Sequence, residues 1–279
     1  MIKELKVNFY RLFRSKSFWV VSILLVIGAI LSAMAIKFFV DDPFNFISEM
    51  KDTVTEYSTT EEDAQSFKII FDSLDQYANV NSLNGVVQMT LCSDLVCFLH
   101  CIVVALFISS EYKSRFHVNR FSLNAAPAFI VFMEWLTLMI EVVIMELICY
   151  GVTLGLSVAM CRSFRFDDAA IMAKNASLAI AVMLAFASFS FMVAYLRKAG
   201  ALAIALSSMF TFGVFDFVLG VASIWADWAG HFALNNTMSM ITLNQLNPMD
   251  YVLKAGAIFL YIACFLGVSL IAAWKRDPY

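Results

Sequence analysis

Six long apolar runs, each about as long as a bilayer crossing, constrain this chain more than any other feature. A bilayer core of about 30 Å takes roughly 20 helical residues to cross. With 61% apolar and 15% charged residues, the 279-residue chain also departs from the composition of soluble domains. We therefore predict an all-α, polytopic membrane protein with six transmembrane helices. The predicted spans are residues 18–36, 86–109, 125–160, 170–196, 199–225 and 251–274.

Residues 1–17 precede the first run and differ from it in charge. Basic side chains alternate there with apolar ones at helical spacing, which predicts an amphipathic helix in the cytosolic headgroup layer. We divide the chain into this interfacial helix and a single transmembrane domain, 18–279. The basic residues of the helix are Lys3, Lys6, Arg11, Arg14 and Lys16.

Charge is distributed unequally between the segments that join the spans. The insertion 38–85 is acidic, with only Lys51 and Lys68 as basic residues. If the amino terminus is cytosolic, 12 of the 19 Lys and Arg residues fall in cytosolic segments. The positive-inside rule therefore predicts a multi-pass protein of the cell membrane with both termini in the cytosol, and with the insertion 38–85 and a hairpin 226–250 outside. An acidic outer surface attracts cations, which favours amphipathic or antimicrobial peptides as cargo.

The short segment 110–124 carries charged residues between two apolar spans. Residues 107–121 read "FISSEYKSRFHVNRF". A loop of this length cannot fold alone, so its charges meet either anionic lipid headgroups or another protein. Composition leaves both alternatives open, and the aromatic side chains of Phe116 and Phe121 favour a docking surface.

Three stretches resemble the membrane subunit of type-2 ABC exporters. "RLFRSKSFW" at 11–19 is similar to the family's start of span one, and "FISSEYKSRF" at 107–116 to its end of span two and cytosolic coupling helix. "LNPMDYVLKA" at 246–255 is similar to the start of its last span. The chain departs from the family pattern at Ser114-Arg115, where a Gly-Thr pair is frequent, and at Glu134, where a basic residue often opens span three.

This resemblance implies a permease subunit that forms half of a substrate pathway. Two separate ABC ATPase subunits would drive it, beside a second permease copy or a homologous permease. ATP and Mg²⁺ would be bound by the ATPase, and this chain would hold no cofactor. The sequence agrees, since it contains no Gly-x-x-x-x-Gly-Lys-Ser/Thr phosphate loop. The residues implied to dock the ATPase are Glu111, Tyr112, Lys113, Arg115, Phe116, His117 and Arg120.

Ionisable residues inside the predicted spans are the next informative group, because each costs about 2.5–3.5 kcal/mol near the bilayer centre on insertion scales. They are Asp94, His100, Glu141, Glu146 and Asp216. We assign Asp94, Glu141 and Asp216 to the substrate pathway. The alternative to this role, a structural pairing such as that of Asp216 with His100 or with a partner subunit, stays open.

Two functions of other classes also stay open. An intramembrane enzyme would need paired carboxylates such as Asp94 and Asp216, although the sequence spells no nucleophile with its base and we predict no catalytic residue. A peptide sensor or immunity protein would bind its ligand through the acidic insertion. The net charge of −3 argues against a nucleic-acid partner.

One helical face groups Asp94, Cys97 and Cys101, which suggests a metal site at first sight. Thiols inside an apolar helix more often pack as small core residues than bind a metal ion. We therefore predict no metal site.

Overall fold

The computed structural model describes residues 2–41, 49, 81–114, 126–161, 164–166, 169–223, 225, 232–242 and 247–275. Every regular element in these ranges is an α-helix. Five helices are long and apolar enough to cross a membrane, and a bent helix pair makes six if it counts as one span. The prediction of an all-α, polytopic membrane protein is confirmed.

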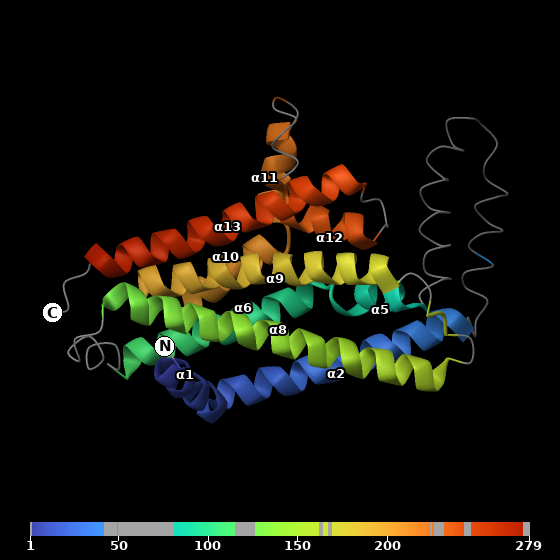
Figure 1. The fold of residues 1–279 in the computed structure, drawn as a ribbon, viewed down its shortest axis with the longest axis horizontal. Coiled ribbons are helices and arrows are strands. Elements are labelled where there is room, and N and C mark those ends of the chain that lie inside the picture. The colour runs from blue at the N-terminus through green and yellow to red at the C-terminus, as the bar shows by residue number, and fades with distance from the viewer. Residues whose placement is uncertain are drawn as a thin grey trace.

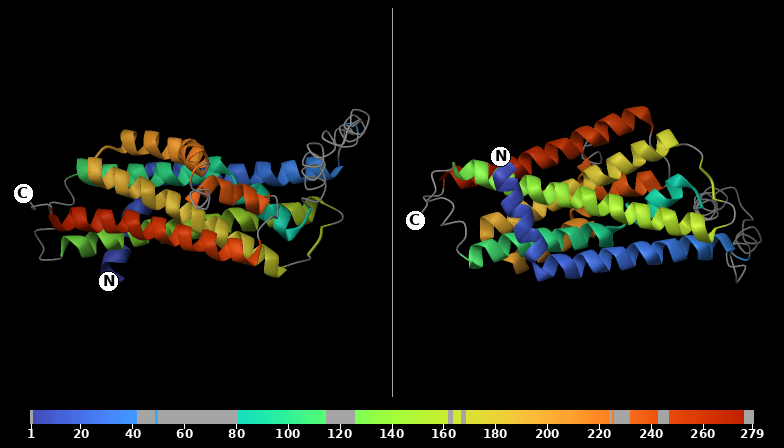
Figure 2. Two further views of the ribbon diagram at one scale, coloured as in Figure 1. Left: turned by 90° about the horizontal axis from the view of Figure 1, so that it is seen from above. Right: turned by 60° about the horizontal axis from the view of Figure 1, so that its bottom comes forward.

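Five long helices run side by side along the molecule (Figure 1). Helices α2, α8, α9 and α13 begin and end within a few residues of the predicted spans 18–36, 125–160, 170–196 and 251–274. The amino-terminal helix α1 (Ile2–Arg14) and the end of α13 lie at the same end of the bundle (Figures 1 and 2). The long helices are α2 (Lys16–Asp41), α6 (Asp94–Lys113), α8 (Pro127–Met160), α9 (Ala169–Arg197) and α13 (Pro248–Lys275).

Helix α9 occupies the centre of the bundle, where it packs against α6, α8, α13 and α10 (Gly200–Thr211). Its large side chains Phe186, Phe191 and Tyr195 are fully buried. The ring of Phe186 meets the ring of Phe210 of α10 edge to face, with 5.1 Å between centroids. The core is therefore built around α9, whereas α2 and α13 expose many large apolar side chains, as a surface in contact with lipid requires.

Helix α1 (Ile2–Arg14) crosses the bundle obliquely at one end, packed against α8 and α2 (Figure 2). It buries Asn8 and Leu12 and exposes Tyr10 and other residues of its opposite face. The indole Nε1 of Trp19 donates a 2.7 Å hydrogen bond to the carbonyl oxygen of Phe13, which holds the corner between α1 and α2. The amphipathic helix predicted within 1–17 is present.

The predicted span 86–109 is wrong at its start. The chain forms a separate short helix, α5 (Leu83–Thr90), and α6 begins only at Asp94. The hydroxyl of Ser82 caps α5 by accepting a 3.0 Å hydrogen bond from the backbone N–H of Gly85. Hydropathy cannot reveal this break, because α5 is apolar and packs inside the bundle against α2, α8 and α9.

The predicted span 199–225 is not one continuous helix. Helices α10 and α11 (Val214–Ser223) meet at an angle of 45° across a two-residue break. Gly213 in this break has a φ of +81°, a conformation that strains residues with a Cβ atom. The second half of the span therefore leaves the bundle (Figure 1).

Two of the predicted extramembrane regions lie largely outside the described residues: most of the acidic insertion 38–85, and residues 115–124 of the segment 110–124. Within the predicted hairpin 226–250, the structure describes α12 (Leu234–Thr242), which packs against α9 and α11.

Candidate functional site

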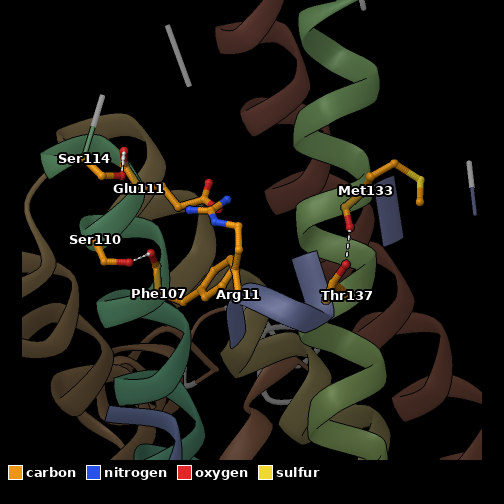
Figure 3. A network of polar contacts seen from close by, with 7 residues as sticks. All are labelled: Arg11, Phe107, Ser110, Glu111, Ser114, Met133 and Thr137. Atoms are coloured by element: carbon orange, nitrogen blue, oxygen red, sulfur yellow. Dashed lines mark hydrogen bonds and ion pairs between the residues drawn. The ribbon is translucent and has the colours of Figure 1, made fainter. Parts of the chain in front are cut away.

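The last turn of α6 is fastened to α1 by an ion pair. The Arg11 guanidinium donates a hydrogen bond to the Glu111 carboxylate and also lies over the ring of Phe107, with its Cζ 5.5 Å from the centroid (Figure 3). Phe107 and Glu111 are four residues apart on α6 and so present the ring and the carboxylate to α1 on one side. The Glu111 side chain is fully buried and that of Arg11 is 20% exposed. The pair therefore joins the two helices away from most of the solvent.

Two serine side chains form hydrogen bonds with backbone carbonyl groups at the end of α6 (Figure 3). The hydroxyl of Ser114 donates a 3.1 Å hydrogen bond to the carbonyl oxygen of Glu111, and that of Ser110 donates a 2.7 Å bond to the carbonyl oxygen of Phe107. Carbonyl groups of a last helical turn lack intrahelical partners, so the Ser114 bond supplies one. The helix therefore ends in a hydrogen-bonded turn at the start of the segment 110–124 that is predicted to dock a partner.

Tyr112 ties the same turn to the end of α9. Its hydroxyl donates a 3.2 Å hydrogen bond to the carbonyl oxygen of Tyr195, and the two rings lie 6.0 Å apart. Lys198, with a φ of 55° just after α9, holds its ammonium 5.5 Å from the centroid of the Tyr112 ring. The end of α6 is thus held by α1 through Glu111 and by α9 through Tyr112.

Of the seven residues predicted to dock an ATPase, the structure describes three. Glu111 is buried and Tyr112 is partly buried against the protein, so only Lys113 of these is exposed. Glu111 is buried and pairs with Arg11 at the end of α6, and its predicted docking role stays a prediction. The other four, Arg115, Phe116, His117 and Arg120, lie outside the described residues.

A second group of ionisable side chains lies inside the bundle between α6 and α8. The Nε2 atom of His100 is 2.5 Å from a carboxylate oxygen of Glu146, and both side chains are almost fully buried. Glu141, which is 3% exposed, lies within electrostatic range of both. Among the described residues, neither oxygen of Glu141 has a hydrogen-bond partner. Buried polar atoms left this way cost about 1–3 kcal/mol each, which makes the group a candidate binding site.

Glu141 also lines a groove of about 500 Å³ on the side of the bundle. The groove lies between α1, α2 and α8, and most of its lining is apolar or aromatic. Glu141 lies on α8, the helix that corresponds to the predicted span 125–160.

Asp216 has a structural partner that the sequence did not suggest. Its carboxylate accepts hydrogen bonds from the backbone N–H groups of Leu234, Asn235 and Asn236, at 3.3, 2.5 and 3.2 Å. These groups begin α12, so Asp216 caps that helix from α11. The suggested pairing of Asp216 with His100 is wrong, because His100 pairs with Glu146.

Asp94 opens α6 and is half-buried, within electrostatic range of Asp216. Glu141 belongs to the separate group with His100 and Glu146. The three residues predicted to line one pathway are therefore divided between two polar groups.

Sequence reasoning missed two residues that organise these sites. Arg11 was grouped with four other basic residues of the first 17, and its partner lies 100 positions away in the sequence. Asn235 donates from its side chain to the carbonyl oxygen of Thr211 at 2.7 Å, across the break in span five. Neither pairing has a local sequence pattern. Within the ranges that the structure describes, no group of three or more His, Cys, Asp and Glu side chains is arranged to hold a metal ion.

No protein-family model matches this chain, and searches of curated proteins and of solved structures found no significant match.

Proposed function

We propose that this chain is the membrane-spanning permease subunit of a type-2 ABC exporter. It would form half of a substrate pathway in the cell membrane, with both termini in the cytosol, and pair with a second permease copy or a homologous permease. Two ATPase subunits would bind ATP and Mg²⁺ and act on the segment 110–124. Amphipathic or antimicrobial peptides are the proposed cargo.

The ion pair between Arg11 and Glu111 is the observation that carries this proposal. An exporter without its own nucleotide site must receive a displacement from its partner, and this requires a rigid connection between the contacted loop and the spans. The loop follows directly on a helical turn that Glu111 fastens to α1 and Tyr112 fastens to α9. A force applied after Ser114 would therefore reach three helices together.

The hydrogen bonds of Asp216 give less support to the alternative function, an intramembrane enzyme. A catalytic pair would need the carboxylates of Asp94 and Asp216 free to exchange protons with a substrate. Both oxygens of Asp216 accept backbone hydrogen bonds from α12. This use is structural, so we do not propose catalysis there.

Purification of the chain from its native membranes tests the proposal. The wild-type protein, extracted in mild detergent, is expected to co-purify with an ABC ATPase that is identified by mass spectrometry and by vanadate-sensitive ATP hydrolysis. Reversing the charge of the predicted loop with the double substitution Arg115→Glu and Arg120→Glu should remove the ATPase from the purified material.

The double substitution Lys51→Glu and Lys68→Glu is the matched control, because it reverses two charges in the acidic insertion and should leave the ATPase bound. Co-purification that survives the loop substitutions would contradict the docking role of 110–124. Solute movement by the reconstituted chain alone, without ATP, would contradict the proposed function itself.

A further inference from the structure

The groove between α1, α2 and α8 ends beside exposed basic side chains of α1 and of the start of α2. We propose that it binds one anionic phospholipid, with an acyl chain along the groove and the phosphate against Lys6, Arg14 and Lys16. This inference does not require the exporter proposal, because a lipid binds to this chain alone.

The surface of the groove suits a hydrocarbon chain. Its volume is about 500 Å³, and its accessible surface is almost wholly apolar. Aliphatic side chains of α2 and α8 form the walls, and aromatic rings lie at the corner of α1 and α2. Glu141 and Ser22 are among the lining residues, but they are buried and add almost no polar surface. The groove therefore favours an apolar chain over a polar molecule.

The groove opens toward lipid. Ile23 and Ile27 on α2, and Ile144 and Ile148 on α8, line it and are all exposed. Both helices are long and apolar enough to cross a membrane, so these side chains face the hydrocarbon of the bilayer. An acyl chain can therefore enter sideways from the bilayer without crossing a polar barrier.

The length of the groove matches one leaflet of a bilayer. Its lining on α2 extends from Phe18, near the corner with α1, to Ile27. At a helical rise of 1.5 Å per residue, this stretch is about 14 Å long. Half of a hydrocarbon core of about 30 Å is about 15 Å. A chain whose headgroup lies at α1 therefore reaches the middle of the bilayer where the groove ends.

Basic side chains lie at the end of the groove that α1 forms. Lys6, Phe9 and Phe13 are spaced i, i+3 and i+7 and so share one face of α1, and the two rings line the groove. Arg14 follows Phe13 directly, and Lys16 begins α2. All three cations are exposed. A lipid with its acyl chain in the groove therefore has its phosphate beside them.

These three cations are available to an anion from outside the chain. Arg11 of the same helix is paired with Glu111. Among the residues that the structure describes, no acidic side chain forms an ion pair with Lys6, Arg14 or Lys16. Each basic side chain near an anionic membrane surface strengthens binding about fivefold. An anionic phospholipid therefore matches both the groove and the cations, whereas a zwitterionic lipid brings a cation of its own.

A second copy of this chain fits the same surface less well. Twofold symmetry would place the same patch of the two copies face to face. The basic side chains beside one groove would then approach those beside the other, and like charges in an interface repel. The charge of this surface therefore favours an anionic lipid over a second copy.

Quenching of Trp19, which lines the groove and is exposed, provides the test. The other four tryptophans are replaced by Phe, and the purified protein is placed in phosphatidylcholine nanodiscs. Increasing fractions of the lipid are exchanged for phosphatidylglycerol or phosphatidylcholine with a 6,7-dibromostearoyl chain, whose bromine atoms quench indoles on contact. The apparent affinity for phosphatidylglycerol should exceed that for phosphatidylcholine by about fivefold or more.

Two double substitutions test the role of the cations. Lys6→Gln with Lys16→Gln should reduce the preference for phosphatidylglycerol to less than about twofold. The matched control is Lys37→Gln with Lys174→Gln, which removes two exposed lysines near the end of α2 and near the start of α9, and it should retain the preference. A preference that survives in the first variant, or that falls equally in both, overturns the inference.

A single substitution in the wall tests the acyl chain. Ile144→Phe narrows the groove and should weaken phosphatidylglycerol severalfold, whereas Leu147→Phe, at an exposed position of α8 that does not line the groove, should leave it unchanged. Equal effects of the two substitutions would place the lipid outside the groove. Equal quenching by the two lipids before either substitution would mean unselective lipid contact, and absence of quenching would mean that protein covers Trp19. Each of these results overturns the inference.

Discussion

The side-chain amide of Asn235 donates a 2.7 Å hydrogen bond to the carbonyl oxygen of Thr211, where the helix of span five is interrupted. The break at residues 212–213 deprives this carbonyl of its helical partner. In a lipid environment no water replaces it, so the side chain of α12 completes the backbone of α10. Together with the capping of α12 by Asp216, this bond connects the two halves of the bent span to α12.

Asn235→Ala should therefore destabilise the protein by about 1–3 kcal/mol, because it leaves a buried carbonyl without a donor. Thermal unfolding in detergent, followed by tryptophan emission, measures the change. Asn236→Ala is the control: its exposed side chain is removed while its backbone bond to Asp216 is retained, and stability should be unaffected. Equal losses for both variants would show that Thr211 does not depend on Asn235.

Breaking the ion pair between α1 and α6 should have a large effect. Glu111→Ala leaves the Arg11 guanidinium in a mostly buried position and should cost on the order of 3 kcal/mol. The charge exchange Arg11→Glu with Glu111→Arg should recover part of this loss, measured as a coupling energy in a double-mutant cycle. Arg14→Ala on the same helix, where the side chain contacts exposed Tyr10 at 3.4 Å, should change stability little. Simple additivity of the two reversals would contradict a direct pairing.

The buried pair of His100 and Glu146 should behave non-additively under apolar substitution. His100→Leu leaves Glu146 without its partner and should destabilise by about 3–5 kcal/mol, whereas the double variant with Glu146→Leu should lose much less. Chemical or thermal unfolding of the four proteins of the cycle gives these values. A double variant as unstable as His100→Leu would mean that packing, not charge, dominates at this position.

Gly200 is required by the close approach of α10 to α6. A Cβ atom there would lie 2.9 Å from the Cβ of Ser109 and 3.3 Å from the carbonyl oxygen of Ala105. Gly200→Ala should destabilise by about 1–3 kcal/mol through overpacking. Gly151→Ala on α8, where an added Cβ meets nothing within 4 Å, should be neutral or stabilise by up to about 1 kcal/mol through helix propensity. The unfolding temperature of Gly200→Ala should therefore fall below that of the wild type, whereas that of Gly151→Ala should stay the same or rise.

Cysteine labelling tests the predicted sidedness. In a background without the six native cysteines, Ser114→Cys should react with a membrane-impermeant maleimide only after the cells are permeabilised. Phe166→Cys, at the other end of the bundle where Phe166 is 65% exposed, should react in intact cells. The reverse pattern would place the amino terminus outside.

Hydropathy located the spans that are long and uninterrupted. Helices α8 and α9 match residues 125–160 and 170–196 because their runs are bounded by polar residues at both ends. Hydropathy misses the breaks before Asp94 and at Gly213, since the runs on both sides of each break are apolar and a hydropathy window averages over the few polar residues between them. Ser93-Asp94 and Gly213 were the only local hints of a helix start and a bend.

The candidate sites were predicted as residue types and not as arrangements. Glu141, Glu146 and His100 are recognisable from the sequence as costly intramembrane groups, but which of them pair depends on how α6 and α8 are placed relative to each other in the bundle. The capping role of Asp216 required knowledge that α12 begins beside α11. Such contacts join residues that are far apart in the chain. No pattern in a single sequence indicates which of these distant residues will meet.

Helix α1 contributes to both sites at once. Arg11 holds the last turn of α6, and Phe9 and Phe13, within a turn of it on the same helix, line the groove. A rotation of α1 therefore alters the groove and the end of α6 together. If a molecule in the groove shifts α1 and so changes the affinity of a partner for the end of α6, thermodynamic reciprocity requires that this partner change the affinity of the groove by the same factor.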